Sequence, residues 1–237
     1  MIPHFFNEGP FDTPKSLVPS ELLSKALGYR RWLSENNSCE SYIHDIAWTE
    51  DNYGCCLSLA DNHIDMLRAH HYLTDALASR NEYWENKKNS STEIPWTENN
   101  LANWYLIVDS KQRALFRHYR KECSYNNVKS LYESAIKKYL KIDETDKSNH
   151  KLTIAGIINN YAVLLTKFCY YDEAKAQFER ALSLYDSDSK SLGKDKIADN
   201  KEKTLALEQN PEQKMDFTIF SGARSIIISS EHKGFIF

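Results

Sequence analysis

The most basic stretch of the sequence runs from residue 111 to residue 121 and reads KQRALFRHYRK. Four of its cations follow the spacing i, i+4, i+7 and i+8, which places them on one face of a helix. These four are Arg113, Arg117, Arg120 and Lys121. Arginines on one face can make bidentate contacts with carboxylates and phosphates. The pattern predicts a surface for an acidic or phosphorylated peptide, and the alternative interpretation is a solvated charged face.

The same stretch has a second interpretation, because Phe116 and Tyr119 lie between its cations. Aromatic rings beside basic side chains can stack the bases of RNA. The whole chain argues against nucleic acid, since 30 basic and 33 acidic residues give a net charge of -3. An RNA-binding module built on residues 111–121 therefore stays an alternative to the peptide surface.

Three histidines form the next candidate site, and they are His63, His70 and His71, with Asp61 and Asp65 nearby. His63 and His70 are seven residues apart and share a helical face, which is a spacing that metal sites can use. The HExxH motif is absent, and two ligands do not complete a metal site. We expect structural or surface histidines, and no metal or other cofactor.

Nucleophilic chemistry has little support in the sequence. The five cysteines are an odd number without a CxxC pair, as expected for reduced thiols in a cytosolic protein. Cys55 and Cys56 lie within a helical segment, where a buried inert thiol is the usual state. The chain has no GxSxG, and its glycines are too far apart for GxGxxG. The sequence predicts no catalytic residue and a protein that is not an enzyme.

Composition predicts an all-α fold. Hydrophobic residues make up 41% and charged residues 27%, which suits a globular chain with a sizeable core. The six prolines leave residues 20–94 and 96–210 without any, and proline is a helix breaker. No apolar run is long enough to span a membrane. The first residues show no secretory signal, so we expect a cytoplasmic protein.

Apolar periodicity divides the chain into an extended arm (1–19), a helical domain (20–210) and a tail (211–237) in which FTIF-SG-ARSIII predicts a β-like hairpin. Helices are predicted at about 20–35, 40–60, 63–80, 98 onward with a break near Asp109, 126–142, 151–168, 171–186 and 195–208. Polar loops are predicted at 81–97, with Thr97 as a helix cap, at 141–151 and at 186–196.

One segment resembles a known repeat. Residues 158–184 read INNYAVLLTKFCYYDEAKAQFERALSL. Ala162 lies in the first predicted helix, Tyr171 lies at the turn, and Ala174, Phe178 and Ala181 form an A-x3-F-x2-A pattern in the second. Small residues of this kind let two helices approach to about 8–10 Å. The segment resembles the tetratricopeptide repeat family, in which antiparallel helix pairs stack into a solenoid.

Two weaker repeats fit upstream of this one. Tyr125, Tyr132 and Ala135 match the turn and the second helix, while Phe116 and Val128 replace small residues. Because Ala181 follows Ala135 by 46 residues, the spacing is long and resembles that of kinesin light chains. We expect the extra residues in the polar loop at 143–150.

The third match has Ala69, Leu73 and Ala76 in its second helix and residues 53–60 in its first. Either Gly54 or Leu57 could occupy the small site of this first helix, and the sequence leaves the choice open.

The resemblance implies a short α-solenoid of about three helical pairs that acts as a protein-binding scaffold or adaptor. In the family, first helices line a concave groove that holds a peptide. The implied groove positions are Arg113, Arg117, Arg120, Lys121, Asn159, Val163, Thr166 and Lys167. The alternative function is a regulatory helical subunit whose partner docks on the tail. The sequence names neither the partner nor the oligomeric state.

Overall fold

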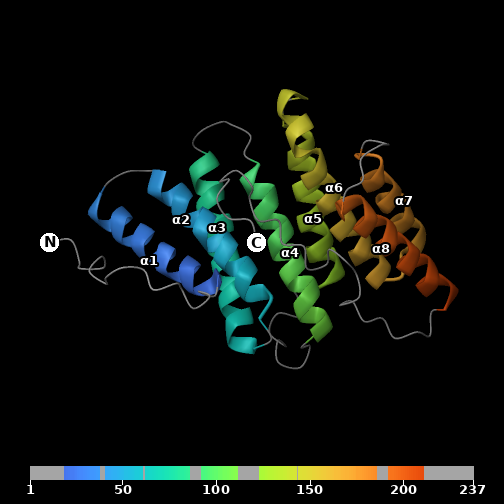
Figure 1. Cartoon of the computed structure of the whole chain (residues 1–237), viewed down its shortest axis with the longest axis horizontal. Helices are drawn as coiled ribbons and strands as arrows, with labels where there is room; N and C mark the ends of the chain where they lie inside the picture. Colours follow the sequence, from blue (N-terminus) through green and yellow to red (C-terminus); the bar gives the residue numbers. More distant parts are fainter. Residues whose placement is uncertain are drawn as a thin grey trace.

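The structure is a computed structural model that describes residues 19–37, 41–60, 62–85, 92–111, 123–142, 144–185 and 192–210 (Figure 1). All the secondary structure in these residues is helical, as the composition predicted. The helices are α1 (Pro19–Asn36), α2 (Ser41–Ser58), α3 (His63–Glu85), α4 (Glu93–Lys111), α5 (Tyr125–Leu140), α6 (Glu144–Lys167), α7 (Tyr171–Leu182) and α8 (Leu192–Gln209). The predicted arm up to residue 18 and the predicted tail lie outside the described residues.

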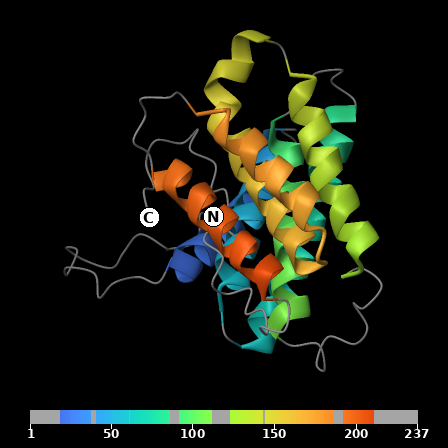
Figure 2. The ribbon, with the colours of Figure 1, turned by 90° about the vertical axis from the view of Figure 1, so that its right-hand side faces the viewer.

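Each helix packs against the helices before and after it in the sequence, so the helices follow one another along the long axis (Figure 1). The closest pairs are α2 with α3, α6 with α7, and α4 with α5. The even-numbered helices also touch each other in the order α2, α4, α6, α8. Figure 2 shows α8 lying across the end of this array. The even-numbered helices thus form one continuous row.

Three odd-numbered helices repeat the same core spacing, in which an alanine or valine is followed four positions later by a large residue and three positions after that by an alanine. Its members are Ala69, Leu73 and Ala76 in α3, Val128, Tyr132 and Ala135 in α5, and Ala174, Phe178 and Ala181 in α7. None of these side chains is more than 2% exposed. The pattern read from the sequence therefore marks the side of each helix that faces the core.

The predicted loop at 81–97 is wrong, because α3 continues to Glu85 and α4 begins at Glu93. Pro95 lies in the first turn of α4, where backbone N–H groups have no partner within the helix and a missing N–H costs nothing. Thr97 is a buried residue within α4 that donates its hydroxyl to the Glu93 carbonyl (3.2 Å), so it does not cap the helix.

The predicted polar loop at 143–150 is also wrong, because α6 begins at Glu144. In Figure 1 its first turns (yellow) extend beyond the neighbouring helices. A polar sequence does not by itself exclude a helix, because none of these residues is a proline or a glycine. The predicted linker at 186–196 likewise ends early, since α8 starts at Leu192.

The helix that packs against α5 also differs from the prediction. The sequence match placed the first helix of the middle pair around Phe116, which lies outside the described residues. In the structure α4 packs against α5, and its Ala102 is 0% exposed. The first-helix alanines Ala102 and Ala162 are 60 residues apart, whereas the second-helix alanines Ala135 and Ala181 are 46 apart. A search with one fixed offset therefore misses α4.

The turn between α6 and α7 has a Schellman geometry centred on Cys169. This residue has a φ of 62°, in the left-handed region. The Tyr170 N–H donates to the Leu165 carbonyl (2.9 Å), and the Cys169 N–H donates to the Thr166 carbonyl (3.0 Å). These two bonds satisfy carbonyls at the end of α6 and reverse the chain into α7.

The small site of the first pair is Gly54, which the sequence could not distinguish from Leu57. A Cβ atom at Gly54 would lie 2.8 Å from Leu73 Cγ and 3.1 Å from the Ala69 carbonyl oxygen. The backbone of α2 therefore approaches α3 at this point more closely than any side chain permits. Leu57 is also buried, at 4% exposure, but it is a core side chain and not the crossing point.

Gly54→Ala should therefore destabilise the protein. Crowding of a packed core costs about 1–3 kcal/mol, and the better helix propensity of alanine returns about 1 kcal/mol, which leaves a net loss near 1 kcal/mol. Gly28→Ala is the matched control, because a Cβ there meets nothing within 4 Å, and it should gain about 0.5–1 kcal/mol. Urea denaturation of both variants measures this, and equal effects would contradict the close approach.

Candidate functional site

The predicted binding residues divide into two groups in the structure. Arg113, Arg117, Arg120 and Lys121 lie outside the described residues, which resume at Cys123 after α4 ends at Lys111. The remaining four, Asn159, Val163, Thr166 and Lys167, lie on α6, where they were expected.

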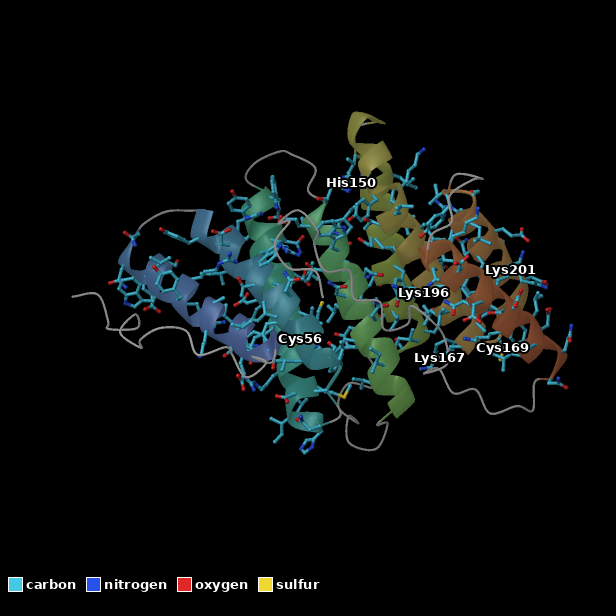
Figure 3. All side chains as sticks on the ribbon, viewed as in Figure 1. Cys56, His150, Lys167, Cys169, Lys196 and Lys201 are labelled. Carbon is cyan, nitrogen blue, oxygen red and sulfur yellow. The ribbon has the colours of Figure 1, made fainter. Side chains whose placement is uncertain are left out.

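These four α6 residues do not line an open surface. Thr166 is 0% exposed, and its hydroxyl lies 3.0 Å from the Thr204 hydroxyl of α8. Asn159 is 3% exposed and Val163 is 0% exposed. Helix α8 supplies the partner of Asn159, since Asn200 Nδ2 donates to Asn159 Oδ1 (2.9 Å). Lys167 is half-buried and donates from Nζ to the Leu106 carbonyl of α4 (3.3 Å, Figure 3). The sequence predicted that α6 is the first helix of the last pair and that its groove face is open. In the structure, α8 packs beside α6 and covers that face.

A chain of side-chain hydrogen bonds crosses the whole row of even-numbered helices. It runs through Asn200, Asn159, Asn160, Asn99 and Asn100 and ends at Asp51. The donor–acceptor distances in this order are 2.9, 3.3, 3.1, 3.4 and 3.1 Å. No member is more than 4% exposed. We call this arrangement the amide chain, and it links α8, α6, α4 and α2.

The carboxylate of Asp51 sets the direction of the whole amide chain. A carboxylate only accepts hydrogen bonds, so Asn100 must present its NH2 group to it. The Asn100 Oδ1 then faces Asn99, which must donate in turn, and the same logic passes to Asn160, Asn159 and Asn200. One charge therefore orients five amides, and aligned bonds of this kind polarise and strengthen one another.

The amide chain leaves a signal in the sequence, although the repeat pattern did not reveal it. An Asp-Asn or Asn-Asn pair precedes a small residue in Asp51–Gly54, Asn99–Ala102 and Asn159–Ala162, and α8 carries Asp199-Asn200. The pairs start 48 and then 60 residues apart, so a search at constant period does not align them. In α4 and in α6 the first Asn of the pair donates to the second.

A buried arginine holds the Asp51 end of the amide chain. Arg80 of α3 is 1% exposed, and its Nη1 donates to Asp51 Oδ2 (2.9 Å), to the Glu93 carbonyl (3.1 Å) and to Thr97 Oγ1. Its Nε lies 3.7 Å from Glu93 Oε2. Burying one charge without partners would be costly, and here two carboxylates from α2 and α4 balance it.

The histidine candidates have ordinary structural partners. His70 Nε2 lies 3.1 Å from the Tyr105 hydroxyl, and His71 Nε2 lies 3.3 Å from Asp75 Oδ2. His63, at the start of α3, is exposed. Across the residues that the structure describes, no three His, Cys, Asp or Glu side chains are grouped as a metal ion would require.

Cys55 is buried within α2, as predicted, at 2% exposure. Burial raises the pKa of its thiol well above the ordinary value, and the charge of Asp51 acts in the same direction. A thiol in this state holds little of the thiolate that nucleophilic chemistry needs.

Two further observations bear on the class of protein. Among the described helices, none has the length and apolar character needed to cross a membrane. Comparisons of the chain with protein-family models, with curated proteins and with solved structures found no match in any of the three.

Asn160→Asp tests the direction of the amide chain. This change keeps the shape of the side chain but replaces the donor that faces Asn99 by a carboxylate oxygen. Two acceptors then meet in a dry site, and we expect a loss of about 3 kcal/mol at neutral pH. Asn126→Asp, at an exposed position of α5, should change stability by less than about 0.5 kcal/mol. Chemical denaturation measures both.

The pH dependence of the same variant provides an independent readout. Burial raises the pKa of the new carboxyl, so acidification protonates it and restores a donor toward Asn99. The difference in free energy of unfolding between Asn160→Asp and the wild type should therefore become smaller as the pH falls from about 7 to about 5. A deficit that stays constant across this range would show that the donor direction does not matter.

Proposed function

We propose that this protein is a binding scaffold or adaptor that holds a peptide segment of a partner on a short, tetratricopeptide-like array of helical hairpins. The observation that carries this proposal is the threefold core pattern in α3, α5 and α7. Each of these helices buries a large residue and an alanine at the spacing of the family's second helices, and α5 departs from the family in having Val128 at the small position. Repetition of one supersecondary unit is typical of binding arrays.

The packing order supports the same proposal. Consecutive helices pair as α2 with α3, α4 with α5 and α6 with α7, and first helices touch their counterparts along one row. The small residues Gly54, Ala102 and Ala162 follow the amide-chain pairs in that row, and all three are buried. We infer that α8 closes the array, with Ile197 and Leu207 turned to the core and charged residues on its other side.

The proposed ligand is an acidic or phosphorylated peptide. Support comes from the sequence alone, in which Arg113, Arg117, Arg120 and Lys121 have the i, i+4, i+7 and i+8 spacing that a single helical face requires. Guanidinium groups bind carboxylates and phosphates through paired hydrogen bonds, which suits recognition without turnover. The covered positions Asn159 and Val163 do not belong to the proposed ligand surface in this arrangement, so the basic face carries the proposal.

Arg117→Glu combined with Arg120→Glu should abolish binding of acidic and phosphorylated peptides. Each lost charge-assisted hydrogen bond is worth about 1.5–3 kcal/mol, so affinity should fall at least about tenfold. Lys137→Glu combined with Lys151→Glu is the matched control, because it makes the same change in net charge at two exposed lysines. Fluorescence anisotropy with labelled acidic peptides and a neutral analogue measures the affinities.

Three outcomes of this experiment would contradict the proposed peptide site. If both double variants weaken binding equally, the attraction is a general effect of net charge and the basic face is not a site. If neither variant binds less, or if single-stranded RNA binds more tightly than every peptide, the peptide proposal is wrong.

A further inference from the structure

One hydrogen bond joins the beginning of α2 to the first residue of α4. His44 Nε2 lies 2.7 Å from Glu93 Oε1, although the two residues are far apart in the sequence. The His44 side chain is 27% exposed, so solvent protons reach it, whereas the Glu93 side chain is 9% exposed. An accessible imidazole that bonds to a buried carboxylate is the arrangement through which pH can act on a fold.

Charged and aromatic groups surround this pair on every side. Within α2, Asp45 Oδ1 lies 3.8 Å from His44 Nδ1. From α3, the Tyr83 and Trp84 rings have centroids 5.6 and 6.4 Å from the imidazole. Arg80, also of α3, contacts the far oxygen of Glu93 at 3.7 Å.

Helix α1 packs against α2 next to His44. Its Arg30 donates to the Asp45 carbonyl (2.6 Å) and to Thr49, and its Arg31 pairs with Glu50 (2.7 Å). The carboxylates of Glu93 and Asp45 are therefore the anions nearest the imidazole, and Arg80 is the cation that opposes its charge.

The balance of these groups favours a charged histidine. The hydrogen bond to Glu93 raises the pKa of His44 above its ordinary 6.5, and it outweighs the burial and the charge of Arg80, which lower it. Burial acts to raise the pKa of Glu93, but the His44 bond and Arg80 overcome it and lower this pKa below 4.5. The contact thus favours the charged form of each partner.

We propose that His44 is a proton-operated latch that fastens α2 to the N-terminal end of α4 when it is protonated and loosens this junction when it is neutral. The latch acts on the anchor of the amide chain, because Arg80 contacts both Glu93 and Asp51. Among the described residues, loss of the imidazolium leaves Arg80 as the cation that pairs with Glu93.

The pH window follows from the directions of the two shifts. A raised histidine pKa contributes stability that is present below 6.5 and is lost as the pH rises through the folded-state value. A lowered glutamate pKa contributes stability that is present above 4.5 and is lost as the pH falls through its folded-state value. The latch is therefore closed in mildly acidic solution, between these limits, and opens toward alkaline pH.

A side-chain NMR titration of the full chain tests the latch directly. His44 should titrate above 6.5 in the wild type. Glu93→Gln removes the dominant raising influence. Burial and Arg80, which lower the pKa, then exceed the weaker raising effect of Asp45, so the pKa of His44 should fall below 6.5. Asp75→Asn is the control, because Asp75 pairs with His71 and should leave the His44 titration unchanged. A wild-type His44 that titrates at or below 6.5 would overturn the proposal.

Thermal unfolding gives a second readout that does not depend on the Glu93 variant folding. Between about pH 6 and about pH 8 the Tm of the wild type should fall further than the Tm of His44→Gln, because only the wild type loses the charged histidine. His71→Gln alters an exposed histidine on α3 and should retain the wild-type pH dependence. If His44→Gln keeps the full wild-type pH dependence, His44 is not the latch.

Discussion

The amide chain from Asn200 to Asp51 is the constraint on which the rest of the arrangement depends. A buried amide without a partner costs several times what a satisfied one contributes, so each asparagine tolerates little displacement of its neighbour. Apolar contacts are less demanding, because alanine and leucine faces can slide by a fraction of a turn and still be buried. The asparagines therefore set the axial position of α4, α6 and α8 relative to α2.

Apolar and directional contacts meet in the row of even-numbered helices. Both sets of helices bury hydrophobic side chains, α4 and α6 carry the largest groups of them, and this burial is non-directional. The row of even-numbered helices carries the directional bonds. Helix α4 is central to both, since Asn99 bonds toward α6, Asn100 bonds toward α2, and Ala102 lies in the core.

The charged end of the amide chain connects this framework to the solvent. Inside the fold, Arg80 pairs with Asp51 and Glu93, and Glu93 also pairs with the partly exposed His44. Proton uptake at one accessible ring can therefore act on a network that extends across four helices. In a binding array, such a link would set how firmly the first hairpin is held to the next one.

Local sequence patterns determined the all-helical class, the positions of α1, α2 and α5, and the buried faces of α3, α5 and α7. They could do so because helical periodicity depends only on residues within a few turns of one another. Tertiary structure decided where α4 and α6 begin. It also decided that α2 and α3 cross at Gly54 and that α8 covers Asn159. The amide chain joins residues 41 to 61 positions apart, and hydrogen bonds at that separation exist only after the helices have packed.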